Sequence, residues 1–179
     1  FSIEESDILF LEDYSFLANA YLKLYQSTFN YQWVNRADQI VKKAIEIFFD
    51  EGQGFFKFSS NQSTLFSENL FVLEDGVIPS SNSVMANNLF LLSHYTGNRD
   101  YLNIGKKMID SVIGKAVNDP LDYMNWLNVS TDYSKNFYEI VVVGKNAFQI
   151  SNDLTSRYLP NTLVAASKTD ADEYLIKNR

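Results

Sequence analysis

Hydrophobic residues recur in the first part of the chain at spacings of three and four, the period of one face of an α-helix. This pattern predicts two helices, over residues 6–27 and 32–49, with a glycine-containing stop after the second. The positions expected to be buried are Tyr14, Leu17, Tyr21, Leu24, Ile40 and Ala44.

The pattern of this helix pair returns later in the chain. Residues 15–49 align without a gap with residues 83–117, and the identical pairs include Ser15/Ser83, Ala18/Ala86, Leu24/Leu92 and Asn30/Asn98. A single helix hairpin cannot bury its apolar stripe unaided, so the copies are expected to pack side by side. The repeat therefore predicts a helical toroid or solenoid.

The segments around the second copy are less regular. Two aromatic and β-branched runs, over residues 55–58 and 70–73, predict a small hairpin or extended loop. Pro79 and the polar residues after it predict the start of a third helix that ends near Tyr95, and a fourth helix follows it. Asp119 and Pro120 are expected to open a fifth helix that ends near residue 132.

The last part of the chain has a different pattern. Apolar runs at residues 139–144 and 162–166 flank a helix-like stretch over 147–158, which is the order of a βαβ unit with parallel strands. Residues 168–173 and 178–179 are expected to form a solvated end. We therefore divide the chain into a mainly α toroid fragment, 1–132, and a small C-terminal βαβ appendage, 133–179.

Composition and charge narrow the classes of function. The net charge of −7 disfavours nucleic acid and anionic membranes as partners, because no basic surplus is present to neutralise phosphates. The chain contains no cysteine, which excludes disulfides and thiolate chemistry and favours a cytoplasmic location. The first residue, Phe1, is followed by no basic leader and is expected to lie inside a longer protein.

Two acidic clusters are the first candidates for chemistry. Glu12 and Asp13 lie early in the first helix, and Glu74 and Asp75 precede the third. In a toroid both clusters are expected at one mouth, where paired carboxylates serve as general acid and base or bind sugar hydroxyls. The alternative is structural, because acids favour the first turn of a helix and an Asp-Gly pair favours a turn.

The segment from residue 75 to 83 is rich in residues that form turns and bind polar ligands. Ser80 and Asn82 offer a hydroxyl and an amide at a helix N-terminus, although capping alone explains one such residue. Tyr14 is a candidate floor on which a sugar ring stacks. His94 is the single histidine and is expected at a wet helix end, so we predict neither a metal site nor a cofactor.

Five blocks carry a resemblance to a known family. They are residues 11–17 (LEDYSFL), 49–56 (FDEGQGFF), 75–83 (DGVIPSSNS), 96–101 (TGNRDY) and 139–144 (EIVVVG). Together they resemble the C-terminal part of the YyaL-type, spermatogenesis-associated thioredoxin-like proteins. The resemblance implies an N-terminal thioredoxin-like domain followed by an (α/α)6 barrel similar to N-acylglucosamine 2-epimerases and glycoside-processing enzymes, of which this chain is the last part.

Three departures from the family pattern bear on function. The thioredoxin-like domain and its cysteines are missing, Ser81 stands where the family has glycine, and His94 has no second histidine for epimerase-like chemistry. The first functional hypothesis is a carbohydrate-binding or carbohydrate-processing pocket for a sugar-like molecule, formed by Asp13, Tyr14, Asp75, Ser80 and Asn82. The alternative is a non-catalytic structural or interaction module that supports the thioredoxin-like domain. Because the hairpins carry broad apolar faces, we also expect a homodimer of the fragment.

Overall fold

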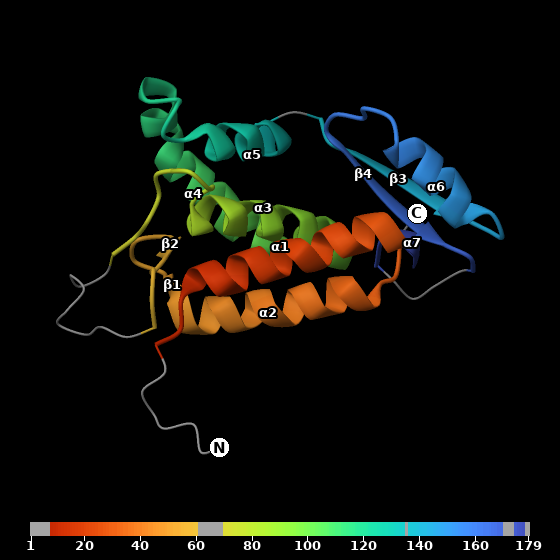
Figure 1. Cartoon of the computed structure of the whole chain (residues 1–179), viewed down its shortest axis with the longest axis horizontal. Coiled ribbons are helices and arrows are strands. Elements are labelled where there is room, and N and C mark those ends of the chain that lie inside the picture. Colours follow the sequence, from red (N-terminus) through yellow and green to blue (C-terminus); the bar gives the residue numbers. More distant parts are fainter. Residues whose placement is uncertain (1–7, 61–69, 135, 170–173, 178–179) are drawn as a thin grey trace, which may run out of the picture.

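The computed structural model describes residues 8–60, 70–134, 136–169 and 174–177 of the 179-residue chain. Figure 1 shows two helix hairpins that lie together, a further helix, α5, that crosses near them, and an α/β segment at one end. Helices α1 and α3 both run from the end near β1 and β2 toward the α/β segment. The mainly helical character predicted from the sequence is confirmed.

The first hairpin joins α1 (Leu11–Thr28) to α2 (Gln32–Phe48). Phe29 ends α1 in the left-handed conformation, with φ of 51°, and its N–H donates to the Tyr25 carbonyl. The helix begins later than predicted because the chain before it is extended: the Leu11 N–H donates to the Phe58 carbonyl at 3.0 Å. The part of the predicted helix before residue 8 lies outside the described residues.

The buried face of α1 differs from the predicted stripe. Leu17 and Leu24 are 43% and 41% exposed, and Tyr14 and Tyr21 are half-buried, so the prediction for the two leucines is wrong. In α2, Ala44 is buried as predicted and Ile40 is half-buried. Helix α1 has apolar residues on two adjacent faces. The face that packs into the core is not the predicted one, and its buried residues are Leu11, Ser15, Ala18, Leu22 and Tyr25.

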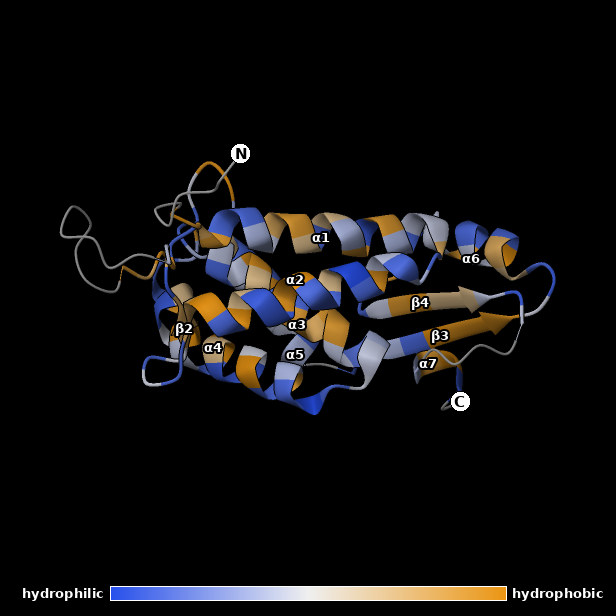
Figure 2. Cartoon of the chain, turned by 90° about the horizontal axis from the view of Figure 1, so that it is seen from below, coloured by the Kyte–Doolittle hydropathy of each residue, from blue (hydrophilic) through white to orange (hydrophobic). Residues whose placement is uncertain are grey.

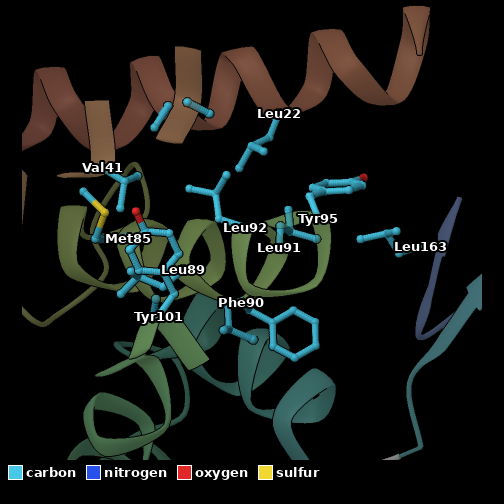
Figure 3. Packing of buried hydrophobic residues seen from close by; sticks show 14 of the residues in the cluster. Leu22, Val41, Met85, Leu89, Phe90, Leu91, Leu92, Tyr95, Tyr101 and Leu163 are labelled. Atoms are coloured by element: carbon cyan, nitrogen blue, oxygen red, sulfur yellow. The ribbon is translucent and has the colours of Figure 1, made fainter. Parts of the chain in front are cut away.

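The second hairpin joins α3 (Ser81–Thr96) to α4 (Arg99–Asn118), which confirms that both copies of the repeat are helix pairs. Gly97, with φ of 72°, ends α3. Nearly every residue of α3 is buried, because α1, α2, α4 and α5 surround it. Figure 3 shows Met85 and Leu92 on the side of α3 that faces α1 and α2, with Phe90 on the opposite side.

The connection between the hairpins contains a different pairing from the predicted one. Strand β1 (Phe49–Asp50) pairs antiparallel with β2 (Phe55–Phe56) around a turn in which Asp50 accepts the N–H groups of Gly52 and Gln53. Residues 70–73 form no strand, although the Phe58 N–H donates to the Leu70 carbonyl at 2.9 Å. Of the two alternatives, the hairpin between 55–58 and 70–73 is therefore wrong, whereas an extended loop fits residues 70–73. Residues 61–69 lie outside the described part of the chain.

Helix α5 (Met124–Ser134) starts later than predicted. Asp119 and Pro120 lie in a turn closed by a hydrogen bond from the Asp122 N–H to the Asp119 carbonyl at 3.1 Å. This turn reverses the chain after α4, so the proline acts as a turn residue rather than as the first residue of a helix.

The C-terminal prediction of a βαβ unit is confirmed. Strand β3 (Tyr138–Val143) pairs parallel with β4 (Thr162–Ser167), and α6 (Ala147–Thr155) connects them. The end of the chain is not wholly solvated as predicted, because a short helix, α7 (Tyr174–Lys177), buries Leu175 and Ile176. The hydrophobic core runs without interruption from the helices to β4.

Candidate functional site

Asp75 lies at the centre of a hydrogen-bond network before α3. One carboxylate oxygen, Oδ1, accepts the Ser80 N–H at 2.8 Å and the Ser83 hydroxyl at 3.1 Å. The other, Oδ2, accepts the Asn125 N–H at 2.8 Å, and the Asp75 N–H donates to the Asp122 carbonyl at 2.7 Å. This one side chain therefore ties its own loop to the start of α3 and to the start of α5.

Ser80 and Ser83 complete the network at the N-terminus of α3. The Ser80 hydroxyl accepts the Ser83 N–H at 3.2 Å, which makes Ser80 the N-cap. The Ser83 hydroxyl receives a hydrogen bond from the Asn125 side-chain amide at 2.8 Å. Ser80 is 4% exposed and Ser83 is fully buried, so both hydroxyls serve contacts inside the chain.

Asn82 is fully buried and joins α3 to the preceding connection. Its Oδ1 accepts the Phe56 N–H at 2.9 Å, while its Nδ2 donates to the Phe56 carbonyl at 2.9 Å and to the Val72 carbonyl at 3.2 Å. The amide therefore replaces a strand partner for β2. These contacts use both amide hydrogens and the amide oxygen of Asn82 inside the chain.

Asp13 and Tyr14 lie apart from this network. Asp13 is exposed on the first turn of α1, and the Tyr14 ring packs edge-on against Phe48 of α2 with centroids 5.2 Å apart. No hydrogen bond or ion pair joins Asp13 to Asp75 in the part of the chain that the structure describes. Of the five predicted site residues, Asp75 and Ser80 are therefore joined by a hydrogen bond, whereas the Asn82 side chain, two residues further along, contacts Phe56 and Val72 instead.

Two members of this region were missed from the sequence. Asn125 supplies two of the hydrogen bonds described above, and the neighbouring Trp126 donates its indole N–H to the Leu73 carbonyl at 2.7 Å. Burial and the carboxylate of Glu74 raise the pKa of Tyr123, which donates to Glu74 at 3.4 Å. The Tyr-Met-Asn-Trp run over residues 123–126, at the start of α5, was a detectable signal, because it concentrates hydrogen-bonding and aromatic side chains in one short segment.

His94 is more enclosed than the wet helix end that the sequence predicted. Its Nδ1 lies 2.6 Å from Glu139 Oε1, and its ring packs against Phe90 and Phe137. The pair joins α3 to β3. It is a link between the helical part and the α/β segment.

Asp132, near the end of α5, gives a pH-dependent prediction. Burial raises the pKa of this carboxyl, and the charge of nearby His94 lowers it less. A raised native pKa means that the folded protein binds the proton more tightly than the unfolded chain, so stability falls as the pH rises through that pKa. We expect Asp132→Asn to raise the free energy of unfolding at pH 7 by up to about 1 kcal/mol.

This gain is expected to vanish at about pH 2.5, well below the ordinary aspartate pKa of about 3.9, because the wild-type carboxyl is then neutral in both the folded and the unfolded protein. Urea unfolding of both proteins at the two pH values measures the difference. A variant that is less stable than the wild type at pH 7 contradicts the role of burial at Asp132.

Two hollows could hold a ligand, and only the first lies beside the Asp75 network. One, of about 260 Å³, lies beside Asp75 and is lined mainly by loop residues and by Leu121, Met124, Asn125 and Asn128. A larger one, of about 650 Å³, separates the end of α1 from α6 and β4 and is lined by polar side chains that include Lys23, Gln26, Asn152 and Arg157. Both open to solvent.

Metal sites and membrane spans are two further features considered for residues 8–60, 70–134, 136–169 and 174–177. In these ranges no group of three or more histidine, aspartate or glutamate side chains is arranged to hold a metal ion. No helix within the same ranges combines the length and the apolar character needed to span a membrane.

Comparison with known proteins bears on the family. Spermatogenesis-associated protein 20 of Homo sapiens and that of Mus musculus are each 25% identical to this chain over 171 residues. The match covers 93% of this chain but 22% of each relative, so the chain spans only a minor part of their length. No family model matches the chain. The similarity over most of the chain supports a relationship to the spermatogenesis-associated protein 20 family.

Proposed function

We propose that this chain is a structural and interaction module, an arc of an α/α toroid, rather than a sugar-binding pocket. The observation that carries the proposal is the use of the polar groups of Asp75, Ser80 and Asn82 inside the chain. A ligand at these residues has to displace hydrogen bonds that hold α3, and each buried group left unpaired costs about 1–3 kcal/mol.

The arrangement of the hairpins supports the toroid. Helices α1 and α3 lie side by side in the same direction, because Asn19 contacts Asn88 near their middles and Tyr25 contacts Tyr95 near their ends. Helix α5 packs on the next side of α3. Repeated helix pairs stacked in this order build a curved layer. In the longer proteins that the resemblance implies, such a layer supports a thioredoxin-like domain, and the absence of cysteine agrees with a cytoplasmic setting.

A carbohydrate role is the second candidate, and the hollow beside Asp75 favours it. That hollow combines the amides of Asn125 and Asn128 with apolar side chains, a mixture that suits the polar edges and apolar faces of a sugar. Asp13 and Tyr14, which lie on α1, are not among the residues that line it.

Asp75→Asn separates the two functions. The new amide cannot accept the Asn125 N–H with its nitrogen, so the structural proposal expects a loss of about 2 kcal/mol, or roughly 5 °C in the unfolding temperature. Asp13→Asn, on the exposed face of α1, is the matched control and is expected to change little. Differential scanning fluorimetry measures both.

Calorimetric titration with glucose, N-acetylglucosamine and mannose completes the test. The structural proposal expects no binding of these sugars by the wild type. Sugar binding that Asp75→Asn abolishes, in a variant that keeps its wild-type unfolding temperature, overturns the proposal in favour of the carbohydrate pocket.

A further inference from the structure

The hollow of about 650 Å³ lies where the helical part meets the α/β segment. Its walls are the last turns of α1, the end of α6 and the start of β4, and Figure 2 shows α6 and β4 beyond the end of α1. The ring of Phe29, directly after α1, packs on Phe148 of α6 with centroids 6.0 Å apart, which holds two of the walls together. The volume is within the range of about 300–1,000 Å³ that is typical of small-molecule sites.

The charge of this hollow is opposite to that of the chain. Lys23 of α1 and Arg157, directly after α6, line it, and none of the described lining residues is an aspartate or a glutamate. Within the part of the chain that the structure describes, neither cation forms an ion pair. Helices α1 and α6 both end here, and each helix end contributes roughly half a negative charge, which two full positive charges exceed. In a chain of net charge −7, the hollow therefore attracts anions.

The hydroxyl groups in the walls are arranged to accept hydrogen bonds. Those of Ser27, Thr155 and Ser156 each donate to a carbonyl one turn earlier in the chain, at 3.0, 3.2 and 2.8 Å. Since the single hydrogen of each hydroxyl is used in this way, only its lone pairs are left for a ligand. The walls therefore suit a ligand that brings O–H donors of its own in addition to a negative charge.

Gln26 connects the hollow to the core. It lines the hollow, and its side-chain oxygen accepts a hydrogen bond from the Lys23 ammonium at 3.2 Å. Burial raises the pKa of the Tyr95 hydroxyl, and Gln26 lies close enough to oppose this rise. In the described part of the chain that hydroxyl is buried without a hydrogen-bond partner, which is rare in folded proteins. Figure 3 shows Tyr95 between α1 and Leu163, which also lines the hollow, so the orphaned hydroxyl lies behind its wall.

We propose that this hollow binds a small organic anion that carries hydroxyl groups, of the class of a sugar phosphate or a sugar acid. Lys23 and Arg157 contact its anionic group, because ammonium and guanidinium groups donate charge-assisted hydrogen bonds to phosphate and carboxylate oxygens. The hydroxyls of the ligand donate to Thr155 and Ser156. The hollow does not include Asp75 or its partners, so this ligand is additional to the proposed structural role.

Calorimetric titration of the full chain at low ionic strength tests the site with four compounds: glucose 6-phosphate, glucuronate, inorganic phosphate and glucose. At least one of the two organic anions is expected to bind with a Kd of about 0.1–1 mM, and the one that binds more tightly identifies phosphate or carboxylate as the anionic group. Inorganic phosphate is expected to bind about tenfold more weakly because it lacks the additional hydroxyls. Glucose, which has no charge, is expected not to bind.

Charge-neutral variants locate the binding. Lys23→Gln combined with Arg157→Gln is expected to weaken it by a factor of about ten or more, since each change removes a hydrogen bond to a charged group. Both residues are exposed, so the variant is expected to keep the wild-type unfolding temperature. Lys107→Gln, which removes an exposed charge from α4, is the matched control and binds as the wild type does. The inference is overturned if neither organic anion binds, if inorganic phosphate binds as tightly as both, or if the double variant keeps the wild-type affinity.

Discussion

Replacing Asn82 by alanine is expected to lower the free energy of unfolding by about 3 kcal/mol. The amide is fully buried and bonds the N–H and the carbonyl of Phe56 and the carbonyl of Val72. Alanine leaves these backbone groups without their partner, and each buried unpaired group costs about 1–3 kcal/mol. Urea unfolding followed by far-UV circular dichroism measures the loss.

Two further variants make this prediction specific. Asn82→Asp keeps the shape and accepts the Phe56 N–H but cannot donate to the two carbonyls while ionised, so it is also expected to destabilise the fold. Asn103→Ala, on the exposed face of α4, is expected to change stability by at most about 0.5 kcal/mol. An Asn82→Ala protein as stable as the Asn103→Ala protein contradicts the structural role of Asn82.

Gly105→Ala is expected to cost about 2 kcal/mol. A methyl group at this position of α4 overlaps the hydroxyl of Tyr133 on α5. That hydroxyl donates to the Ala86 carbonyl at 3.0 Å, and the ring packs on Phe90 with centroids 4.8 Å apart. Because the tyrosine is held at both ends, it cannot move aside without loss of a contact.

Gly114→Ala is the matched control on the same helix. Nothing lies within 4 Å of a methyl group there, and alanine favours helix, so this variant is expected to gain up to about 1 kcal/mol. Chemical unfolding of the two variants therefore gives shifts of opposite sign. A loss of equal size in both contradicts the contact between α4 and Tyr133.

The helices were largely predictable because their signals are local. Capping at Ser80, the stop at Gly97 and the β-branched run of β3 each specify structure within a few residues. The direction in which a helix face points is not local. Leu17 and Leu22 are both apolar, and only the position of α3 decides that Leu22 is buried.

The candidate site was partly predictable for the same reason. The turn and capping chemistry of residues 75–83 marked Asp75, Ser80 and Asn82 as unusual, and in the structure each of them holds the segment before α3 through hydrogen bonds. Their partners on β2 and α5 come from distant parts of the sequence, so the contacts of Phe56 and Asn125 were not predictable. Without these partners, residues that hold a loop and residues that bind a ligand have the same local pattern.

The central claim is that hydrogen bonds fix the segment before α3 and that these groups do not bind a ligand. Amide hydrogen exchange tests this claim most directly. The amide groups whose N–H is held by a side chain of this network are Phe56, Ser80, Ser83 and Asn125. They are expected to exchange as slowly as the middle of α3 and to lose protection together in Asp75→Asn. Fast exchange of these amides in the wild type, with α3 still protected, would show a loop that is free to rearrange and would contradict the account.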